Sequence, residues 1–115
     1  MPTAEECREA FEKMTGRLAE LDPKDRDAFF TGRSFSCRVT DLDVTFVTRF
    51  GPGGLPEPVR EAGPGDPPAN VRMAAASPVV LELAADIHAF PRAWLTGRVK
   101  VQASVRDILR LRKLL

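Results

Sequence analysis

The stretch from residue 51 to residue 70 constrains this 115-residue chain more than any other feature, because glycine and proline fill eleven of its twenty positions. Proline lacks the amide hydrogen that a helix interior or a sheet ladder requires, and glycine weakens both structures. The stretch therefore predicts a long loop, with at most a short edge strand near Val59. Loops of this length in small domains are commonly functional, so we expect a mobile cover beside the entrance of a binding site.

The segment before this loop predicts one helix followed by two strands. Apolar residues recur at spacings of three and four, which places them on one helical stripe; they are Cys7, Phe11, Met14, Leu18 and Leu21. Thr3 and Glu6 have the spacing of a capping box, and Pro23 ends the pattern. Residues 34–40 and 44–50 alternate apolar with polar side chains, so the short turn between them predicts an antiparallel hairpin.

The segment after the loop predicts two further strands and three helices. Residues 70–76 and 98–104 alternate as strands, and residues 105–115 have the period of a helix. Between the strands, Ser77 is expected to cap a helix with Pro78 at its first position. The apolar stripe of that helix is predicted to consist of Val79, Val80, Leu83, Ala84 and Ile87. A second short helix is expected to open at Pro91 and to stop at Gly97.

The order and polarity of these elements predict the fold class. The strands are apolar on one face and polar on the other, and helices do not alternate strictly with strands. Such a pattern favours an α+β fold with a mostly antiparallel sheet and helices packed on one face. A chain of this length is expected to form a single domain over residues 1–115.

Composition excludes several classes of protein. The 17 basic and 16 acidic residues leave a net charge of +1, which argues against a nucleic-acid partner. Cys7 and Cys37 form neither a zinc-binding pattern nor a redox pair, so both are predicted to be buried free thiols. The chain opens without a secretory signal and has no apolar run long enough to cross a bilayer, so we expect a cytoplasmic protein.

Few residues are candidates for chemistry. His88, the single histidine, is predicted to lie near a helix C-terminus, where a cation is favourable, and nothing beside it resembles an activated nucleophile. Asp41 and Asp43 flank the predicted turn, where aspartate is common, and two carboxylates alone make a poor cation site. We therefore expect no enzyme activity, no metal and no cofactor.

The C-terminal segment carries an uneven charge. Between Arg98 and Leu115 there are six basic residues and one acid, Asp107. The last helix is therefore basic as well as amphipathic. Such a helix can dock transiently on an anionic membrane surface or an acidic partner. Alternatively, its cations are simply solvated and complement the helix C-terminus.

Residues 70–115 contain three features in a characteristic order. They are the strand at 71–73, the helix that begins at Ser77-Pro78, and the run Ala93-Trp94-Leu95-Thr96-Gly97-Arg98-Val99-Lys100-Val101 before an aliphatic, basic last helix. With these features the segment resembles the second half of the sterol carrier protein type 2 family. The first half of the chain agrees in pattern only. Two features depart from the family. Ala103-Ser104 replaces a usual glycine, and the Gly/Pro-rich loop replaces or flanks the middle strand.

The resemblance implies a small carrier with a lipid-sized apolar tunnel between sheet and helices. Its ligand would be a sterol, a fatty acid or an acyl-CoA, and which of these binds is left open, as is the oligomeric state. The residues predicted to line the tunnel are Phe46, Met73, Leu83, Ile87, Trp94, Val101, Ile108 and Leu109. In the alternative interpretation the core is filled, and the chain is an accessory protein-interaction module that docks through its basic C-terminal helix.

Overall fold

A computed structural model of the chain describes residues 2–18, 20, 22–24 and 30–114. Two members of the predicted helical stripes, Leu21 and Leu115, lie outside the described residues. The elements are α1 Ala4–Leu18, β1 Ser34–Val39, β2 Val44–Arg49, the short 3-10 helix η1 Pro52–Gly54, β3 Arg60–Glu61, β4 Val71–Ala75, α3 Ser77–Ala85, the short 3-10 helix η2 Ile87–Ala89, α4 Phe90–Leu95, β5 Val99–Gln102 and α5 Val105–Leu114.

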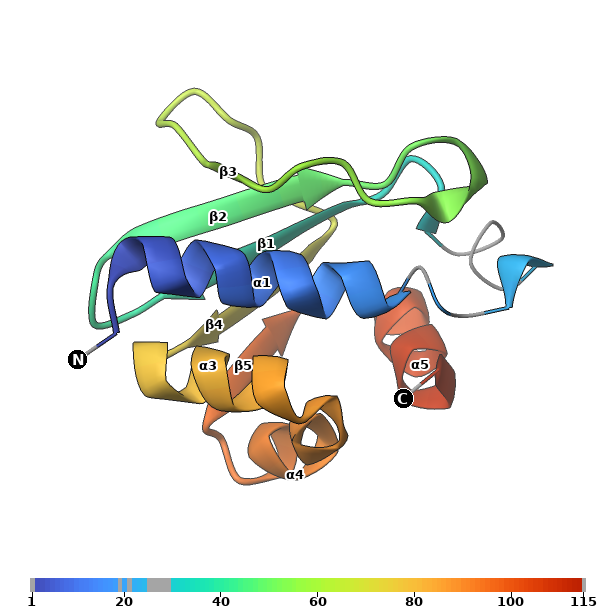
Figure 1. Cartoon of the computed structure of the whole chain (residues 1–115). Helices are drawn as coiled ribbons and strands as arrows, with labels where there is room; N and C mark the ends of the chain where they lie inside the picture. The colour runs from blue at the N-terminus through green and yellow to red at the C-terminus, as the bar shows by residue number, and fades with distance from the viewer. Residues whose placement is uncertain (1, 19, 21, 25–29, 115) are drawn as a thin grey trace.

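The described strands form one sheet in the order β3-β2-β1-β4-β5. β1 pairs with β2 as the predicted antiparallel hairpin, with Cys37 opposite Phe46. β2 with β3 and β4 with β5 are also antiparallel, whereas β1 and β4 run parallel. The prediction of a mostly antiparallel sheet is therefore confirmed. The parallel pair arises because the chain leaves the hairpin, passes β3 and returns on the other side of β1 (Figure 1).

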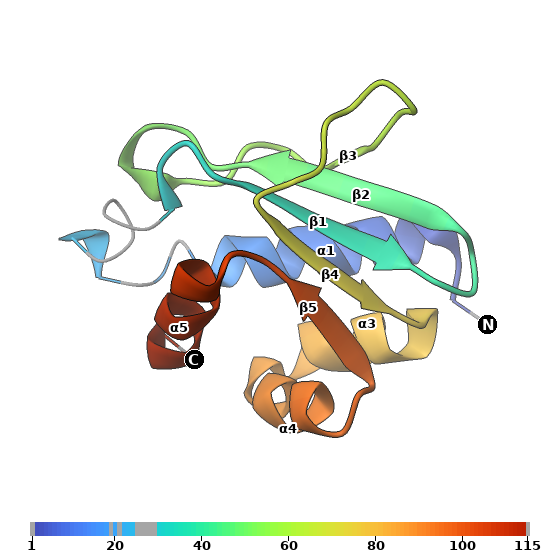
Figure 2. The same ribbon diagram turned by 180° about the vertical axis from the view of Figure 1, so that it is seen from behind.

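The helices cover one face of the sheet, as predicted. α1 and α3 lie side by side across it, α4 lies below β5, and none of these three helices lies on the opposite face (Figures 1 and 2). Val99 and Phe46 are buried on the covered face, and Val44 and Val101 are half-buried there. Three phenylalanines close one end of the core, with ring centroids 4.9–5.5 Å apart; they are Phe30, Phe35 and Phe50.

The start of α1 confirms the predicted capping box. The Thr3 amide donates to the Glu6 carboxylate at 3.0 Å, and the Glu6 amide donates to the Thr3 hydroxyl at 3.1 Å. Both bonds satisfy donors that a helix start would otherwise leave without a partner. On the solvent side of α1, Arg8 forms ion pairs with Glu5 and Glu12.

The start of α3 differs from the prediction. The helix begins at Ser77 itself, and the Ser77 hydroxyl does not cap it but donates to Asp41 at 2.6 Å. The Ser77 amide donates to the other oxygen of the same carboxylate at 2.8 Å. A carboxylate from the hairpin turn thus caps the helix across the fold, which the spacing of neighbouring residues could not reveal.

The end of α3 also differs. The helix stops at Ala85, and Asp86 has an extended backbone with φ −144°. Ile87 therefore begins η2 and does not continue the stripe of Leu83, as its spacing had suggested. The predicted stop at Gly97 is confirmed, because that residue has φ +81°, a region that glycine occupies without steric cost.

The Gly/Pro-rich stretch is a loop with a short edge strand, as expected, but it does not cover a site entrance. Arg60–Glu61 pairs with β2, and residues 62–69 rise from the sheet on the side away from the helices (Figures 1 and 2). Asp66 holds this loop by two hydrogen bonds from Arg60, at 2.8 and 2.9 Å, and one from the Gly63 amide at 2.6 Å.

The last helix, α5, lies apart from α1 and α3, beyond the end of β5 (Figure 2). Its first turn is capped by Ser104, whose hydroxyl oxygen accepts a hydrogen bond from the Asp107 amide at 3.2 Å. The Asp107 carboxylate is buried and pairs with Arg33 at 2.8 Å. Leu109 was predicted to line the tunnel, but it is 57% exposed, and the apolar residue Val105 of the same helix is 76% exposed. Within the described ranges, no helix combines the length and apolarity needed to span a membrane.

Candidate functional site

An apolar cavity of about 80 Å³ lies between the helices and the covered face of the sheet. One wall comes from the inward stripe of α1, a second from the central strands and β5, and a third from the junction of η2 with α4. The lining residues are Phe11, Met14, Thr15, Leu18, Phe35, Ser36, Val71, Met73, Ile87, Phe90 and Val101. Residues of the 51–70 loop are not among them.

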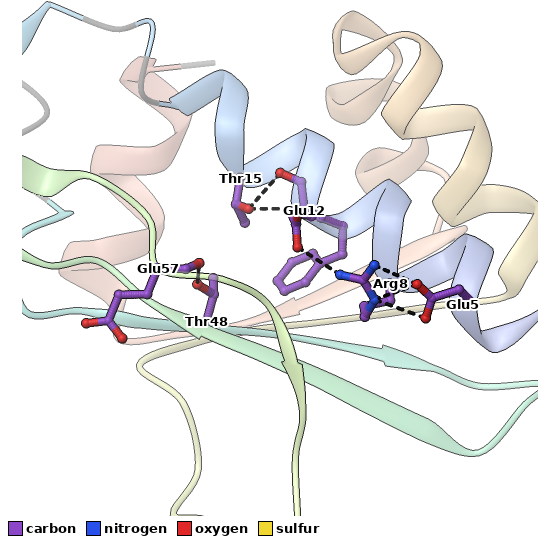
Figure 3. A network of polar contacts seen from close by, with 7 residues as sticks. Glu5, Arg8, Glu12, Thr15, Thr48 and Glu57 are labelled. Atoms are coloured by element: carbon purple, nitrogen blue, oxygen red, sulfur yellow. Dashed lines mark hydrogen bonds and ion pairs between the residues drawn. The ribbon is translucent and has the colours of Figure 1, made fainter.

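The polar group that α1 brings to this cavity is already satisfied. The Thr15 hydroxyl donates back to the carbonyl oxygens of Phe11 and Glu12, both at 3.1 Å (Figure 3). Among the described residues, every buried polar side-chain atom has a hydrogen-bond partner. The cavity therefore offers dispersion contacts and exclusion of water, which suit a hydrocarbon group.

The hydroxyl of a second buried threonine also has a hydrogen-bond partner. Thr48 faces the core from β2, and its hydroxyl donates to the Glu57 carbonyl at 2.6 Å (Figure 3). This bond attaches the loop after β2 to the sheet and leaves the core free of an unpaired hydroxyl, which would be costly there.

The structure brings three of the eight predicted site residues to this cavity, namely Met73, Ile87 and Val101. Phe46 and Leu83 are buried in the core and are not part of its lining. Trp94 packs edge-on against Phe90, with ring centroids 6.0 Å apart, so it adjoins the cavity through a lining residue. Contact of these residues with a ligand stays a prediction.

The two predicted residues of the last helix lie elsewhere. Ile108 is half-buried, and Leu109 is exposed beside a shallow surface hollow that it shares with Val105, Arg106 and Arg110. Neither of these two residues lines the cavity. This placement differs from the prediction because the helical period marks a stripe but does not say what, if anything, covers it.

Sequence reasoning missed most of the wall that α1 contributes. Phe11, Met14 and Leu18 were identified as a buried stripe, yet nothing in their spacing distinguished a cavity wall from a filled core. Phe35 and Val71 were likewise placed on the inner sheet face without being assigned to the site. Phe90 lay just before the predicted start at Pro91, and the signal for it was its position four residues before Trp94, which places both rings on the same side of the helix.

The cysteine and aspartate side chains considered as candidates for chemistry are either buried or already paired within the chain. Burial raises the pKa of the Cys37 thiol to about 12 and also raises that of Cys7, so both stay protonated. Asp41 binds Ser77, whereas Asp43 pairs with Arg38 at 3.1 Å, so the two carboxylates serve different partners. In the part of the chain that the structure describes, no group of three or more potential metal ligands comes together.

Comparison with known proteins shows that this chain shares its fold with solved structures but has low sequence identity to them. No protein-family model matches the chain, and no curated protein matches it. Among solved structures, the ubiquinone synthesis protein UbiJ-SCP2 superposes with a TM-score of 0.60 at 17% identity, over 99% of this chain and 92% of that one. Sterol carrier protein 2 like 2 from Aedes aegypti gives a TM-score of 0.59 at 11% identity, over 92% and 93% of the two chains.

A sec-alkyl sulfatase, PisA1, also contains a region of this shape. The match has a TM-score of 0.62 at 19% identity and covers 99% of this chain but only 16% of the sulfatase. The same arrangement therefore occurs both as a nearly complete chain and as a small part of a large enzyme. Together these likenesses show that the chain has the α+β fold of sterol carrier protein 2.

Proposed function

We propose that this protein is a non-enzymatic carrier that holds the hydrocarbon part of a lipid between its sheet and its helices. The observation that supports this most is the cavity itself, which has an almost wholly apolar lining drawn from α1, the sheet and the η2–α4 junction. The fold shared with sterol carrier proteins supports the same conclusion. Removing apolar surface from water contributes about 25 cal/mol per Å², so a buried acyl chain or ring system needs no polar recognition.

The cavity must widen to take a whole lipid. Its volume of about 80 Å³ is well below the roughly 300 Å³ at which small-molecule pockets begin. The η2–α4 wall is the part most suited to move, because its segments are short and its apolar residues Ile87, Phe90 and Trp94 are only partly buried. We infer that this wall separates from α1 when a ligand enters.

Membrane contact through α5 is the second part of the proposal. Val105 and Leu109 are exposed on the helix, and Arg106 and Arg110 lie beside them around one shallow hollow. Exposed aliphatic residues flanked by arginine suit the interface of an anionic membrane, where each cation near the surface contributes about 1 kcal/mol. Such contact would bring the carrier to the membrane from which a lipid is taken. The two buried free thiols support a reducing, cytoplasmic setting.

An accessory protein-interaction module is the competing function, and one observation favours it. A cavity of about 80 Å³ is also what an incompletely filled core leaves behind. In that case the protein would bind no lipid, and α5 would be a docking surface for another protein.

A pair of matched variants separates these functions. Val101→Phe fills the cavity from β5, whereas Val47→Phe adds the same group on the uncovered face of the sheet. For a carrier, oleate should change the fluorescence of Trp94, the single tryptophan, saturably at micromolar concentration. Val101→Phe should abolish this change and Val47→Phe should keep it. A flat titration of the parent protein with oleate and with a sterol, and no lipid found by native mass spectrometry, would favour the interaction module.

The membrane contact has its own test. Sedimentation with vesicles of phosphatidylcholine and phosphatidylglycerol should deplete the protein from solution, and vesicles of phosphatidylcholine alone should not. The double variant Val105→Ser with Leu109→Ser should reduce binding to anionic vesicles. Equal sedimentation of this variant and the parent would rule out α5 as the contact.

A further inference from the structure

The uncovered face of the sheet carries an unusual distribution of charge. Each of the five strands contributes one exposed cation to it, in the order Arg60, Arg49, Arg38, Arg72 and Lys100 from β3 to β5. The register fixes their common face. Arg38 lies opposite Thr45 and Ala74, Arg60 opposite Val47, Arg49 opposite Ser34, Arg72 opposite Ser36 and Gln102, and Lys100 opposite Ala74. The net charge of +1 for the whole chain conceals this concentration.

Two of these cations already bind carboxylates of the same chain. Asp66, from the loop that rises on this face, receives two hydrogen bonds from Arg60, and Asp43, from the hairpin turn, receives one from Arg38 at 3.1 Å. The arginine beside it holds the pKa of Asp66 well below its usual range. The face is therefore able to bind carboxylates carried by an irregular backbone that lies against it.

The other three cations, Arg49, Arg72 and Lys100, have no ion-pair partner among the described residues. Strand spacing and register place them on a diagonal across the sheet. Their Cα atoms are about 12 Å apart from Arg49 to Arg72 and about 8 Å apart from Arg72 to Lys100. An extended polypeptide matches these distances when its carboxylates are about three or four residues apart at the first gap and about two or three residues apart at the second.

The side chains between the cations narrow the choice of partner. They are small or polar, such as Ser34, Ser36 and Ala74, and the rows named above hold no aromatic side chain on this face. A surface that binds single-stranded nucleic acid uses aromatic platforms for its bases, and one that enters a membrane uses large apolar groups. Arginines among small and polar side chains suit planar carboxylates, which they bind through paired hydrogen bonds.

We propose that Arg49, Arg72 and Lys100 form a docking surface for an acidic segment of a partner protein. This surface is on the opposite side of the sheet from the cavity, so the partner can bind while the cavity is occupied. The proposal does not depend on the proposed lipid binding. Its experimental failure is also distinguishable, because the two tests use different faces and different probes.

The test uses binding of labelled poly-glutamate at low ionic strength, followed by fluorescence anisotropy. The triple variant Arg49→Glu, Arg72→Glu, Lys100→Glu should weaken binding about tenfold or more. Each substitution replaces one exposed ion pair with a glutamate of the probe, which is individually weak, by a repulsion between like charges. The control Lys13→Glu, Lys24→Glu, Arg92→Glu makes the same change in net charge on other surfaces and should bind nearly as well as the parent. Circular dichroism should show both variants folded.

Amide chemical shifts provide a second readout. On addition of poly-glutamate, the shifts of Ser36, Arg38 and Ala74 should move, and those of cavity residues such as Met14 and Phe90 should not. Failure of the parent to bind poly-glutamate, or equal weakening in both triple variants, would overturn the proposal. So would tighter binding, through the same three residues, of a single-stranded oligonucleotide or of phosphatidylglycerol vesicles, which would identify a different anionic partner.

Discussion

Helices α1 and α5 are both amphipathic by sequence, yet the structure uses them differently. α1 buries Cys7, Ala10, Phe11 and Met14 against the sheet and α3. In the described first part of α5 the buried residue is Asp107, whereas Val105 and Leu109 face solvent. α1 is therefore a component of the core, whereas α5 exposes Val105 and Leu109, which are available to a partner outside the domain.

The way each helix is fixed to the fold follows from this difference. α1 is stabilised by burial of apolar surface, which is non-directional and distributed over several side chains. In the part of α5 whose side chains are described, the ion pair between Arg33 and Asp107 is a directed contact to the rest of the fold, and Ile108 is half-buried next to Asp107. A helix attached in this manner is expected to open locally at lower cost than the rest of the domain.

The largest effect is expected from matched truncations of the two helices. Phe11 is 2% exposed, so Phe11→Ala should lower the free energy of unfolding by about 3–5 kcal/mol. Leu109→Ala removes an exposed side chain and should change it by no more than about 0.5 kcal/mol. Urea unfolding of both variants measures the contrast. Similar losses would show that α5 is part of the core after all.

A smaller effect is expected from Asp107→Asn, which breaks the contact that fixes α5. Removing one partner of a fully buried pair costs about 3–5 kcal/mol, but solvent reaches Arg33, so we expect about 1–2 kcal/mol. Hydrogen exchange should accelerate more in α5 than in α1. The control Arg110→Gln alters an exposed residue of the same helix and should leave exchange unchanged. Equal acceleration in both helices would contradict local attachment.

Removal of the helix caps tests the same difference between α1 and α5. Thr3→Ala and Ser104→Ala each remove a side-chain oxygen that accepts a hydrogen bond from a backbone amide at the helix start. Each loss should lower helix stability by about 1 kcal/mol. For α1 this loss should appear in global urea unfolding. For α5 it should appear mainly as faster exchange of its own amides. If Ser104→Ala shifts global unfolding as much as Thr3→Ala does, then α5 unfolds together with the core.

The smallest effect concerns the start of α3, which depends on pH. Hydrogen bonds from the Ser77 hydroxyl and amide hold the pKa of Asp41 below its usual value. The ionised carboxylate therefore contributes stability above its unfolded pKa of about 3.9, and this contribution is lost as pH falls through the lowered folded pKa. The melting temperatures of the parent and of Asp41→Asn should differ most near neutral pH and converge in acid. A difference that stays constant with pH would exclude this role.

Much of the fold was predictable because it depends on local rules. The capping box at Thr3, the antiparallel hairpin of β1 and β2, and the stop at Gly97 each follow from neighbouring residues. The edge strand near Val59 was also indicated, since prolines confine such a strand to an edge. The covered and uncovered faces of β5 followed from the alternation of its side chains.

The errors lie where a contact joins residues distant in sequence. The cap of α3 comes from Asp41, 36 residues away, and α5 is fixed by Arg33, 74 residues away. The 51–70 loop was recognisable as a loop, but the face of the sheet on which it stands depends on where β3 and β4 pair. For the same reason, Phe11 and Leu109 both lie on helical apolar stripes in the sequence, yet Phe11 is buried and Leu109 is exposed.

The sequence by itself determined which residues are apolar, which segments form helices and strands, and that the strands have two unlike faces, because propensity and period act over a few residues. Only the tertiary structure decided that Met73, Ile87 and Val101 border a cavity while Phe46 and Leu83 fill the core. It also brought five cations from five separate strands onto one face. Voids and charge clusters of this kind depend on strand order and packing, which a one-dimensional pattern does not contain.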